Sequence, residues 1–251
     1  MTRKSGSLKL KRIAAPKIWP IHRKAYKYII RPRPGPHPKD FSLPLLIILR
    51  DILGVAKTKR EAKRILAEGK VKVDGKIRKE LGYPVGMMDV LELVPSGEVY
   101  RILPSTKGRL ILHPISKDES NFKLCSIYNK TTVRGGHIQL NLHDGRNVLI
   151  RVKNPENPEE DVYKTLDVIK LAIPEQKILD HIPFKEGVLA LIIYGKNMGK
   201  IGKITKIVKT QSPHANVAEL VTLDGEKIET TTKYVFPIGY DKPIISMPEM
   251  S

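Results

Sequence analysis

The stretch KREAKRILAEGKVKVDGK, residues 59–76, carries the signals of a short helix followed by a hairpin. Thr58 stands directly before it as a favourable N-cap, apolar residues recur at helical spacing in its first half, and Gly69 is placed to end the helix. Valines then alternate with lysines up to Asp74-Gly75, a pair typical of tight hairpin turns. The stretch therefore predicts a mixed α+β module.

A second helix is expected before this stretch. Between residues 45 and 52 apolar side chains recur at helical spacing, Ser42 is a suitable N-cap, and Gly54 can close the helix. After the hairpin, MDVLELV at residues 88–94 has the composition of a strand. We therefore expect residues 42–103 to form one small module of two helices plus a hairpin.

The rest of the chain is rich in strand and turn signals. HIQLNLHDGRNVLIRV, residues 137–152, is typical of a hairpin around Asp144-Gly145, and another Asp-Gly pair stands at residues 224–225. The expected fold class is therefore α+β and multi-domain. The expected divisions are an extended basic arm over 1–41, the module over 42–103, a central β-rich domain over 104–180, a β-barrel domain over 181–240 and a C-terminal tail over 241–251.

Charge is the strongest compositional signal. The 251 residues carry 45 Lys and Arg against 26 Asp and Glu, a formal net charge of +19. Residues 1–40 hold 12 of these cations and one acidic residue, and residues 41–110 hold 14 cations and eight acidic residues. Such self-repulsion is costly unless a polyanion neutralises it. The composition indicates nucleic acid as the leading partner, and most of the surplus positive charge lies in the first 110 residues.

The amino-terminal arm combines prolines, cations and aromatic rings. RPRPGPHP, residues 31–38, predicts a stiff polyproline-like strap that holds Arg31, Arg33 and His37 outward. Trp19 lies among the cations and could stack on bases, although aromatic residues here could also pack on the next domain. We expect the arm to be extended and to become ordered only on assembly with RNA.

Other features limit the class of protein. Cys125 is the single cysteine, which excludes an internal disulfide and favours a reducing, cytoplasmic compartment. No apolar run approaches the roughly 20 residues that a bilayer-spanning helix needs. The basic start of the chain lacks the apolar stretch of a secretory signal. The seven histidines show no metal-ligand spacing, so we expect no metal, no cofactor and no membrane partner.

The glycine- and lysine-rich stretch YGKNMGKIGKI, residues 194–204, raises the possibility of a nucleotide loop. A phosphate-binding loop of the G-x-x-x-x-G-K-[ST] type needs four residues between its glycines, a hydroxyl after the lysine and a following helix. The stretch has only three residues between Gly195 and Gly199, Ile201 after Lys200, and β-branched residues beyond. It therefore predicts a hairpin and no small-molecule substrate. The predicted structural turn glycines of the chain are Gly75, Gly145, Gly199, Gly202 and Gly225.

Two segments resemble known RNA-binding elements. Residues 194–204 with their flanking strands resemble the KOW motif of ribosomal proteins and elongation factors, which implies a small SH3-like barrel over 181–240. Residues 42–94 look like the module shared by bacterial ribosomal protein S-four, several pseudouridine synthases and some tRNA synthetases. That likeness implies that the second helix and the following strand face RNA.

Five ordered segments resemble a single family, the "four-e" small-subunit ribosomal proteins of archaea and eukaryotes, in its archaeal form. They are LKRIAAPKIWPIHRK, RPRPGPHP, LPLLIILRDILG, VKVDGKIRKELGYPVGMMDV and YGKNMGKIGKI. The resemblance implies a cytoplasmic ribosome component without catalytic activity, bound to small-subunit ribosomal RNA and to neighbouring ribosomal proteins. A transient assembly or elongation factor is the alternative.

An RNA-modifying enzyme is the least favoured interpretation of the sequence. Pseudouridine synthases with a similar module carry a catalytic aspartate in a GRLD motif, whereas this chain has Ile111 after Gly108-Arg109-Leu110. No carboxylate could act there as a nucleophile.

The predicted RNA contacts fall into three groups. Those of the arm are Lys9, Lys11, Arg12, Lys17, Trp19, Arg23, Lys24, Arg31, Arg33 and His37. Those of the module are Lys59, Arg60, Lys63, Arg64, Lys70, Lys72, Lys76, Arg78 and Lys79. Those of the glycine-rich hairpin are Lys196, Asn197, Lys200 and Lys203. Nearly all are Lys or Arg, which indicates contact with the phosphate backbone rather than base reading.

Overall fold

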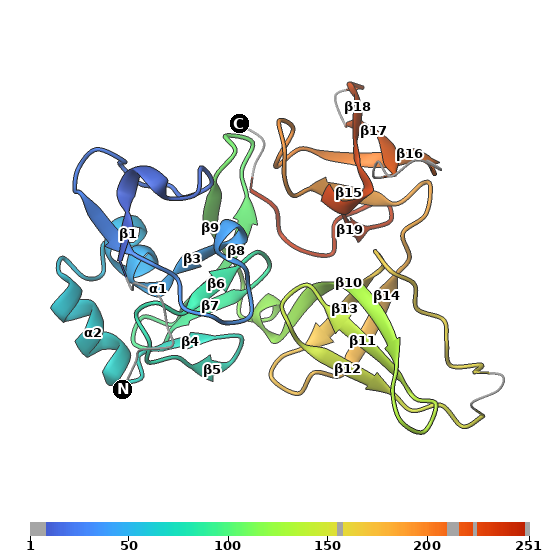
Figure 1. The fold of residues 1–251 in the computed structure, drawn as a ribbon, viewed down its shortest axis with the longest axis horizontal. Coiled ribbons are helices and arrows are strands. Elements are labelled where there is room, and N and C mark those ends of the chain that lie inside the picture. The colour runs from blue at the N-terminus through green and yellow to red at the C-terminus, as the bar shows by residue number, and fades with distance from the viewer. Residues whose placement is uncertain (1–8, 155–157, 210–215, 223–224, 249–251) are drawn as a thin grey trace. The chain divides into compact units, whose positions relative to one another are not determined.

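The computed structural model describes residues 9–154, 158–209, 216–222 and 225–248 (Figure 1). The start of the predicted arm, Asp224 of the predicted Asp-Gly turn and the end of the predicted tail lie outside these residues. The chain divides into two compact units. Unit 1 comprises residues 1–103 and 109–116, and unit 2 comprises residues 104–108 and 117–251. Among the described residues, no helix has the length and apolar character needed to cross a membrane.

Unit 1 packs two helical segments against short antiparallel strands. Helix α1 (Leu45–Ile47) continues as a π-helical turn, η3 (Ile48–Ile52), and α2 (Lys59–Ala67) follows it. Short 3-10 turns are η1 (Arg12–Ala14) and η2 (Lys39–Phe41). The main sheet has the order β5-β4-β7-β8-β9. Its strands are β4 (Val71–Val73), β5 (Lys76–Ile77), β7 (Val90–Leu93), β8 (Glu98–Pro104) and β9 (Leu110–Pro114). Two small sheets pair β1 (Lys9–Lys11) with β2 (Tyr28–Ile30), and β3 (Ser42–Pro44) with β6 (Pro84–Gly86).

The local signals in residues 42–94 correspond closely to this structure. Thr58 caps α2, and its hydroxyl oxygen accepts a hydrogen bond from the Glu61 N–H at 3.2 Å. Gly69 has a φ of 71°, and Asp74 and Gly75 have φ values of 49° and 72°, as a tight hairpin turn requires. The predicted N-cap role of Ser42 is wrong. Ser42 lies in β3, and its hydroxyl donates to the Pro38 carbonyl at 2.9 Å because the chain is extended there.

The predicted extended arm is a packed part of unit 1 over residues 9–41. Trp19 is only 1% exposed, and its indole N–H donates to the Ser42 carbonyl at 2.7 Å. Arg12 is 3% exposed and donates to the His22 carbonyl at 2.6 Å. Burial of the large indole ring and satisfaction of its N–H outweigh the extended preference of the prolines. Arg12 and Trp19 are therefore structural groups, and the prediction that they are exposed to RNA is wrong.

His37 belongs to the same correction. Its Nε2 is hydrogen-bonded to the Asp89 carboxylate at 3.0 Å, and both side chains are 2% exposed. Asp89 also accepts a hydrogen bond from the Gly86 N–H at 2.8 Å. A Cβ at Gly86 would collide with the His37 ring, so glycine is required for this close approach. The predicted outward-facing His37 is instead buried, and it joins the strap to the module.

Unit 2 contains two five-stranded antiparallel sheets. The first has the order β12-β11-β10-β13-β14, and the second has the order β18-β17-β16-β15-β19. The first consists of β10 (Phe122–Thr132), β11 (Ile138–Leu142), β12 (Asn147–Ile150), β13 (Val168–Ala172) and β14 (Ile178–Ile182). The second consists of β15 (Leu189–Ile192), β16 (Ile201–Val208), β17 (Val217–Thr222), β18 (Lys227–Thr231) and β19 (Val235–Gly239). Two 3-10 turns, η4 (Glu119–Asn121) and η5 (Thr232–Tyr234), precede β10 and β19.

The first sheet of unit 2 holds a buried ion pair. Lys123 and Asp144 side chains are 0% and 1% exposed, and Lys123 Nζ donates to Asp144 Oδ2 at 2.9 Å. Arg146 Nε lies 3.2 Å from the same oxygen. Burial acts to raise the pKa of Asp144, but the positive charges of Lys123, His143 and Arg146, together with the hydrogen bond from Lys123, outweigh it and lower the pKa to about 2. Cys125 is buried beside this pair, where it packs as a small core residue.

Two of the expected boundaries differ from the structure. Strand β9 was expected within the central domain, but it lies next to β8 in the sheet of unit 1. The expected tail is packed over residues 243–246. Ile245 is 2% exposed, and the Ser246 hydroxyl donates to Glu119 at 2.6 Å. Apolar burial and this hydrogen bond hold the segment against unit 2.

Candidate nucleic-acid interface

Helix α2 presents cations because its opposite face is buried. Ala62 and Leu66 are fully buried, whereas Lys59 and Lys63 are exposed. Glu61 fixes the start of the helix, since its carboxylate accepts the Lys57 N–H at 2.8 Å and the Thr58 hydroxyl at 3.1 Å. That hydrogen bond, followed by one from the Thr58 hydroxyl, lowers the pKa of Glu61. The helix start is thus fixed, and the lysines of the following turns project from a defined backbone.

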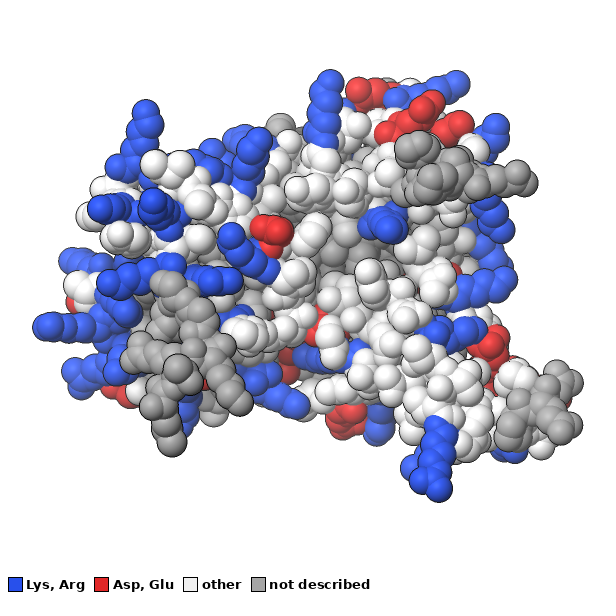
Figure 2. Space-filling view, in the orientation of Figure 1, with Lys and Arg blue, Asp and Glu red and all other residues white. Residues whose placement is uncertain are grey.

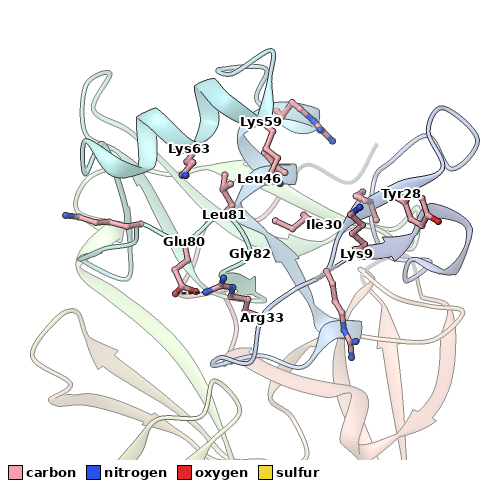
Figure 3. A pocket seen from close by; sticks show the side chains of 14 residues that line it. Lys9, Tyr28, Ile30, Arg33, Leu46, Lys59, Lys63, Glu80, Leu81 and Gly82 are labelled. Atoms are coloured by element: carbon pink, nitrogen blue, oxygen red, sulfur yellow. Dashed lines mark hydrogen bonds and ion pairs between the residues drawn. The ribbon is translucent and has the colours of Figure 1, made fainter. Parts of the chain in front are cut away.

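A groove of about 640 Å³ lies beside α2 in unit 1 (Figure 3). Seven cationic residues line it, and they come from segments well separated in sequence. They are Lys9, Arg31, Arg33, Arg50, Lys59, Lys63 and Lys79. Among the described residues, Glu80 is the one acidic residue of its lining, which also includes Tyr28, Ile30, Leu46, Leu81 and Gly82. We call this feature the basic groove.

The basic groove contains both paired cations and cations without an acidic partner. Arg33 Nη1 donates to Glu80 Oε1 at 3.0 Å, with both side chains about half exposed. Lys59, Lys63 and Lys79 form no ion pair with any residue that the structure describes. Three exposed ammonium groups at one groove create a positive potential, which suits a partner with regularly spaced negative charge.

Figure 2 shows the same concentration of charge on one face of the molecule. Blue Lys and Arg side chains gather over the part of unit 1 where Figure 1 places β1 and α2, and red carboxylates are sparse there. The surplus of positive charge that the sequence places in the first 110 residues therefore gathers on this surface of unit 1.

Other predicted contacts of the module lie outside the groove lining, and several are paired with carboxylates. Lys70 Nζ lies 2.6 Å from Glu68, Arg64 Nε lies 2.9 Å from Glu68, and Lys72 Nζ lies 3.3 Å from Glu92. Hydrogen bonds from Lys70 and Arg64 lower the pKa of Glu68. Exposed pairs of this kind are weak, so a phosphate could replace the carboxylate.

The remaining predicted contacts of unit 1 differ in their surroundings. The Arg78 guanidinium stacks 4.5 Å from the centre of the Tyr83 ring. Arg23 donates to the carbonyls of Ile13 and Pro16, both at 3.1 Å, so it stabilises the fold of the arm. The other side chains of this set are exposed; they are Lys11, Lys17, Lys24, Arg60 and Lys76.

The glycine-rich hairpin of unit 2 joins β15 to β16, as predicted. Gly199 has a φ of 86°, and a Cβ there would collide with the backbone of Ser105 and Thr106. Gly202 lies within β16, where a Cβ would come 2.8 Å from the Val221 carbonyl oxygen. Gly199 therefore needs to be glycine both for its positive φ and for the close approach of another backbone segment. Gly202 needs to be glycine only for the close approach. Gly75, Gly145 and Gly225 all have positive φ, in agreement with their predicted turn roles.

The polar side chains of this hairpin are not gathered into one cationic site. Lys196 is exposed, whereas Lys200 lies 2.5 Å from Glu226 and Lys203 lies 3.5 Å from Asp241. Asn197 accepts the Lys200 N–H through its main-chain carbonyl at 3.2 Å. The hairpin therefore carries a weaker concentration of charge than the basic groove.

Two charged residues of the basic groove were not among the predicted contacts. Arg50 lies among the apolar residues of the first helical stretch, which drew no attention to it as an RNA contact, and it pairs with Asp51 at 2.8 Å. Glu80 had no sequence signal, because its place in the groove depends on the tertiary contact with Arg33. Across the described ranges, no group of three His, Cys, Asp or Glu side chains could hold a metal ion.

Comparison with known proteins identifies the family. The signature of "Ribosomal family S4e" matches residues 96–178, that of the "RS4NT (NUC023) domain" matches residues 4–40, and that of the "S4 domain" matches residues 43–91. The chain is 53% identical over 249 residues to small ribosomal subunit protein eS4 of Staphylothermus marinus, with 99% of each chain covered. The chain belongs to the S4e family of ribosomal proteins.

Further relatives are consistent with this membership. Small ribosomal subunit protein eS4 of Aeropyrum pernix is 49% identical over 99% of this chain and 98% of its own. The crystal structure of 30S ribosomal protein S4e from Thermoplasma acidophilum is 34% identical, with a TM-score of 0.67 over 81% of this chain and 97% of that one. The family resemblance, the S4-type module and the archaeal character predicted from sequence are confirmed. The S4 match covers α2 and residues 79–82, which supply part of the lining of the basic groove.

Proposed function

We propose that this chain is a structural constituent of the small ribosomal subunit, and that its basic groove binds the phosphate backbone of ribosomal RNA. The observation that carries the proposal is that, among the described residues, seven cations from distant segments and a single carboxylate line one groove. Phosphate neutralisation by Lys and Arg supplies affinity largely independent of sequence. Membership of the S4e family supports small-subunit RNA as the polyanion and the cytoplasmic ribosome as the location.

Within the groove, the three unpaired lysines are the leading phosphate contacts. Lys59 and Lys63 are four residues apart on α2, so they occupy neighbouring turns on one side of the helix. Lys79 comes from the segment after β5 and lines the same groove. Like charges at this spacing destabilise an isolated helix, and a phosphate between them removes that cost.

The paired and exposed cations around the groove extend the proposed contact. Lys70 and Lys72 can exchange their glutamate partners for phosphates, and Lys11, Lys17 and Lys24 remain exposed on the packed arm. The role is structural rather than catalytic, with ribosomal RNA and neighbouring ribosomal proteins as partners.

For unit 2 the proposal concerns the type of domain. We infer that residues 181–240 form a KOW-type, SH3-like barrel around the second sheet, with Gly199 as the glycine of the motif. Its five antiparallel strands and the glycine between β15 and β16 support this assignment. Lys196 is the hairpin residue best placed to reach RNA, since its side chain is exposed and forms no ion pair among the described residues.

Two measurements test the proposed function. Quantitative co-sedimentation should find one copy of the chain per mature small subunit, retained after a high-salt wash. The affinity of the free protein for small-subunit RNA should fall with salt, with log K decreasing by roughly 0.7–0.9 per phosphate for each decade of salt. Occurrence on precursor particles only would exclude a structural constituent, and an affinity independent of salt would exclude backbone binding.

A further inference from the structure

The basic groove has an apolar floor as well as a cationic rim. Leu46 is 3% exposed, and Ile30 and Leu81 are partly buried. In Figure 3 these three side chains lie between the lysines of α2 and the Arg33–Glu80 pair. The groove volume of about 640 Å³ falls in the range of about 300–1,000 Å³ that is typical of sites for small organic ligands.

Binding of a duplex backbone does not account for these features. Phosphates and riboses on a duplex surface are polar, so they gain nothing from an apolar floor. Glu80 would repel a phosphate placed beside it. A single nucleotide that has left its helix offers both chemistries at once, because its phosphates are anionic and its exposed base has two apolar faces.

We propose that the basic groove receives one unpaired nucleotide of the RNA, with its base on Ile30, Leu46 and Leu81 and its flanking phosphates on Lys59, Lys63 and Lys79. This inference rests on the proposed RNA contact of unit 1 and adds the identity of the occupant. A flipped nucleotide pays the cost of unstacking, and burial of the base on the floor offsets it.

Glu80 gives the groove a means of distinguishing bases. One of its oxygens accepts the Arg33 hydrogen bond, and an ionised carboxylate has further acceptor positions. Cytosine presents an amino donor at N4, where uracil presents the acceptor O4. The groove therefore favours an unpaired cytidine over a uridine, since uracil would leave Glu80 facing a second acceptor.

The test compares RNA hairpins bound by the full-length protein, and every hairpin is measured at the same series of salt concentrations. One hairpin is fully paired, one carries a single bulged cytidine, and one carries a single bulged uridine. Fluorescence anisotropy should show about tenfold tighter binding of the cytidine bulge than of the paired hairpin. Glu80→Gln should remove the preference for cytidine over uridine, because the amide can donate to O4 as well as accept from N4.

A variant that fills the groove provides the matched control. Leu81→Trp adds a ring on the floor without changing charge, and it should abolish the difference in affinity between the bulged and the paired hairpins. Ile77→Trp adds the same ring on β5 at a side chain that is 53% exposed and outside the groove, and it should retain the preference. If circular dichroism shows that Leu81→Trp does not fold, the nucleotide site is tested by two other results. These are the bulge preference of the wild type and the loss of the cytidine preference in Glu80→Gln.

The outcomes separate this inference from the proposed function. Equal affinity of the wild type for bulged and paired hairpins, with a steep salt dependence, would overturn the nucleotide site and leave backbone binding intact. Retention of the bulge preference by folded Leu81→Trp would also overturn it. Loss of salt-dependent binding to every hairpin would overturn both.

Discussion

Lysine has opposite roles in the two units of this molecule. In unit 1, Lys59 and Lys63 are exposed beside a groove and have no ion pair among the described residues. In unit 2, Lys123 is fully buried and donates to Asp144 at 2.9 Å. The overall charge follows the same division, since residues 1–110 hold 26 cations against nine acidic residues and residues 111–251 hold 19 against 17.

The difference shows that burial and the nearest carboxylate decide what a cation does. A buried ammonium must keep its counterion, because an uncompensated charge in the interior is strongly destabilising. An exposed ammonium costs little to maintain and remains available to a phosphate. We therefore expect changes at the buried pair to affect stability, and changes at the basic groove to affect RNA binding.

The largest expected effect comes from the buried pair. Asp144→Asn removes the charge that compensates Lys123, and it should lower the free energy of unfolding by about 3–5 kcal/mol. Chemical denaturation of the full chain measures this loss. Asp118→Asn is the matched control, because Asp118 is exposed and the same change there should cost less than about 0.5 kcal/mol. A loss at Asp144 no larger than that at Asp118 would contradict the structural role of the pair.

The same carboxylate makes stability depend on acid. The pKa of Asp144 is about 2 in the folded chain, below the ordinary value of 3.8. A lowered folded pKa contributes stability above the unfolded pKa, and protonation removes it as the pH falls through the folded value. Between about pH 4 and pH 2 the wild type should therefore lose about 2 kcal/mol that Asp144→Asn does not lose. Denaturation curves of both proteins across this range measure the difference, and parallel curves would exclude the effect.

A smaller effect tests the packing of the arm in unit 1. Trp19→Phe leaves the Ser42 carbonyl without its indole donor and should cost roughly 1–2 kcal/mol. Trp19 is the single tryptophan, so its fluorescence also reports on the arm directly. In the RNA-free protein the emission should be blue-shifted and poorly quenched by acrylamide. Tyr26→Phe, at a 72% exposed ring, is the control that should leave stability unchanged. If the emission were red-shifted in the free protein and moved to the blue only on RNA binding, the arm would be unfolded until RNA binds.

Sequence reasoning succeeded where a few neighbouring residues determine the backbone. The Thr58 cap, the end of α2 at Gly69 and the turns at Gly75 and Gly145 each depend on contacts within a handful of positions. Propensity and pattern carry that information directly. The family resemblance added the membership of the S4e family, which the comparisons confirm.

It failed where the outcome depends on distant contacts. Prolines around Trp19 favour an extended chain, yet the ring is buried because Ser42 supplies a partner 23 residues away. Lys123 gives no local sign of burial, since its partner Asp144 lies in a hairpin 21 residues further on. The basic groove brings predicted cations together with Arg50, Glu80 and an apolar floor. These residues are far apart in the sequence, so no local pattern indicates that they share one site.

The most direct test of the account compares the two units with matched charge changes. One variant carries Lys59→Ala, Lys63→Ala and Lys79→Ala in the basic groove, and the other carries Lys185→Ala, Lys206→Ala and Lys227→Ala at exposed sites of unit 2. Each loses three positive charges. The slope of log K against log salt for small-subunit RNA should fall by roughly 2–3 in the groove variant and by less than 1 in the unit 2 variant. Equal reductions in the two variants would show that net charge, and not the groove, governs binding.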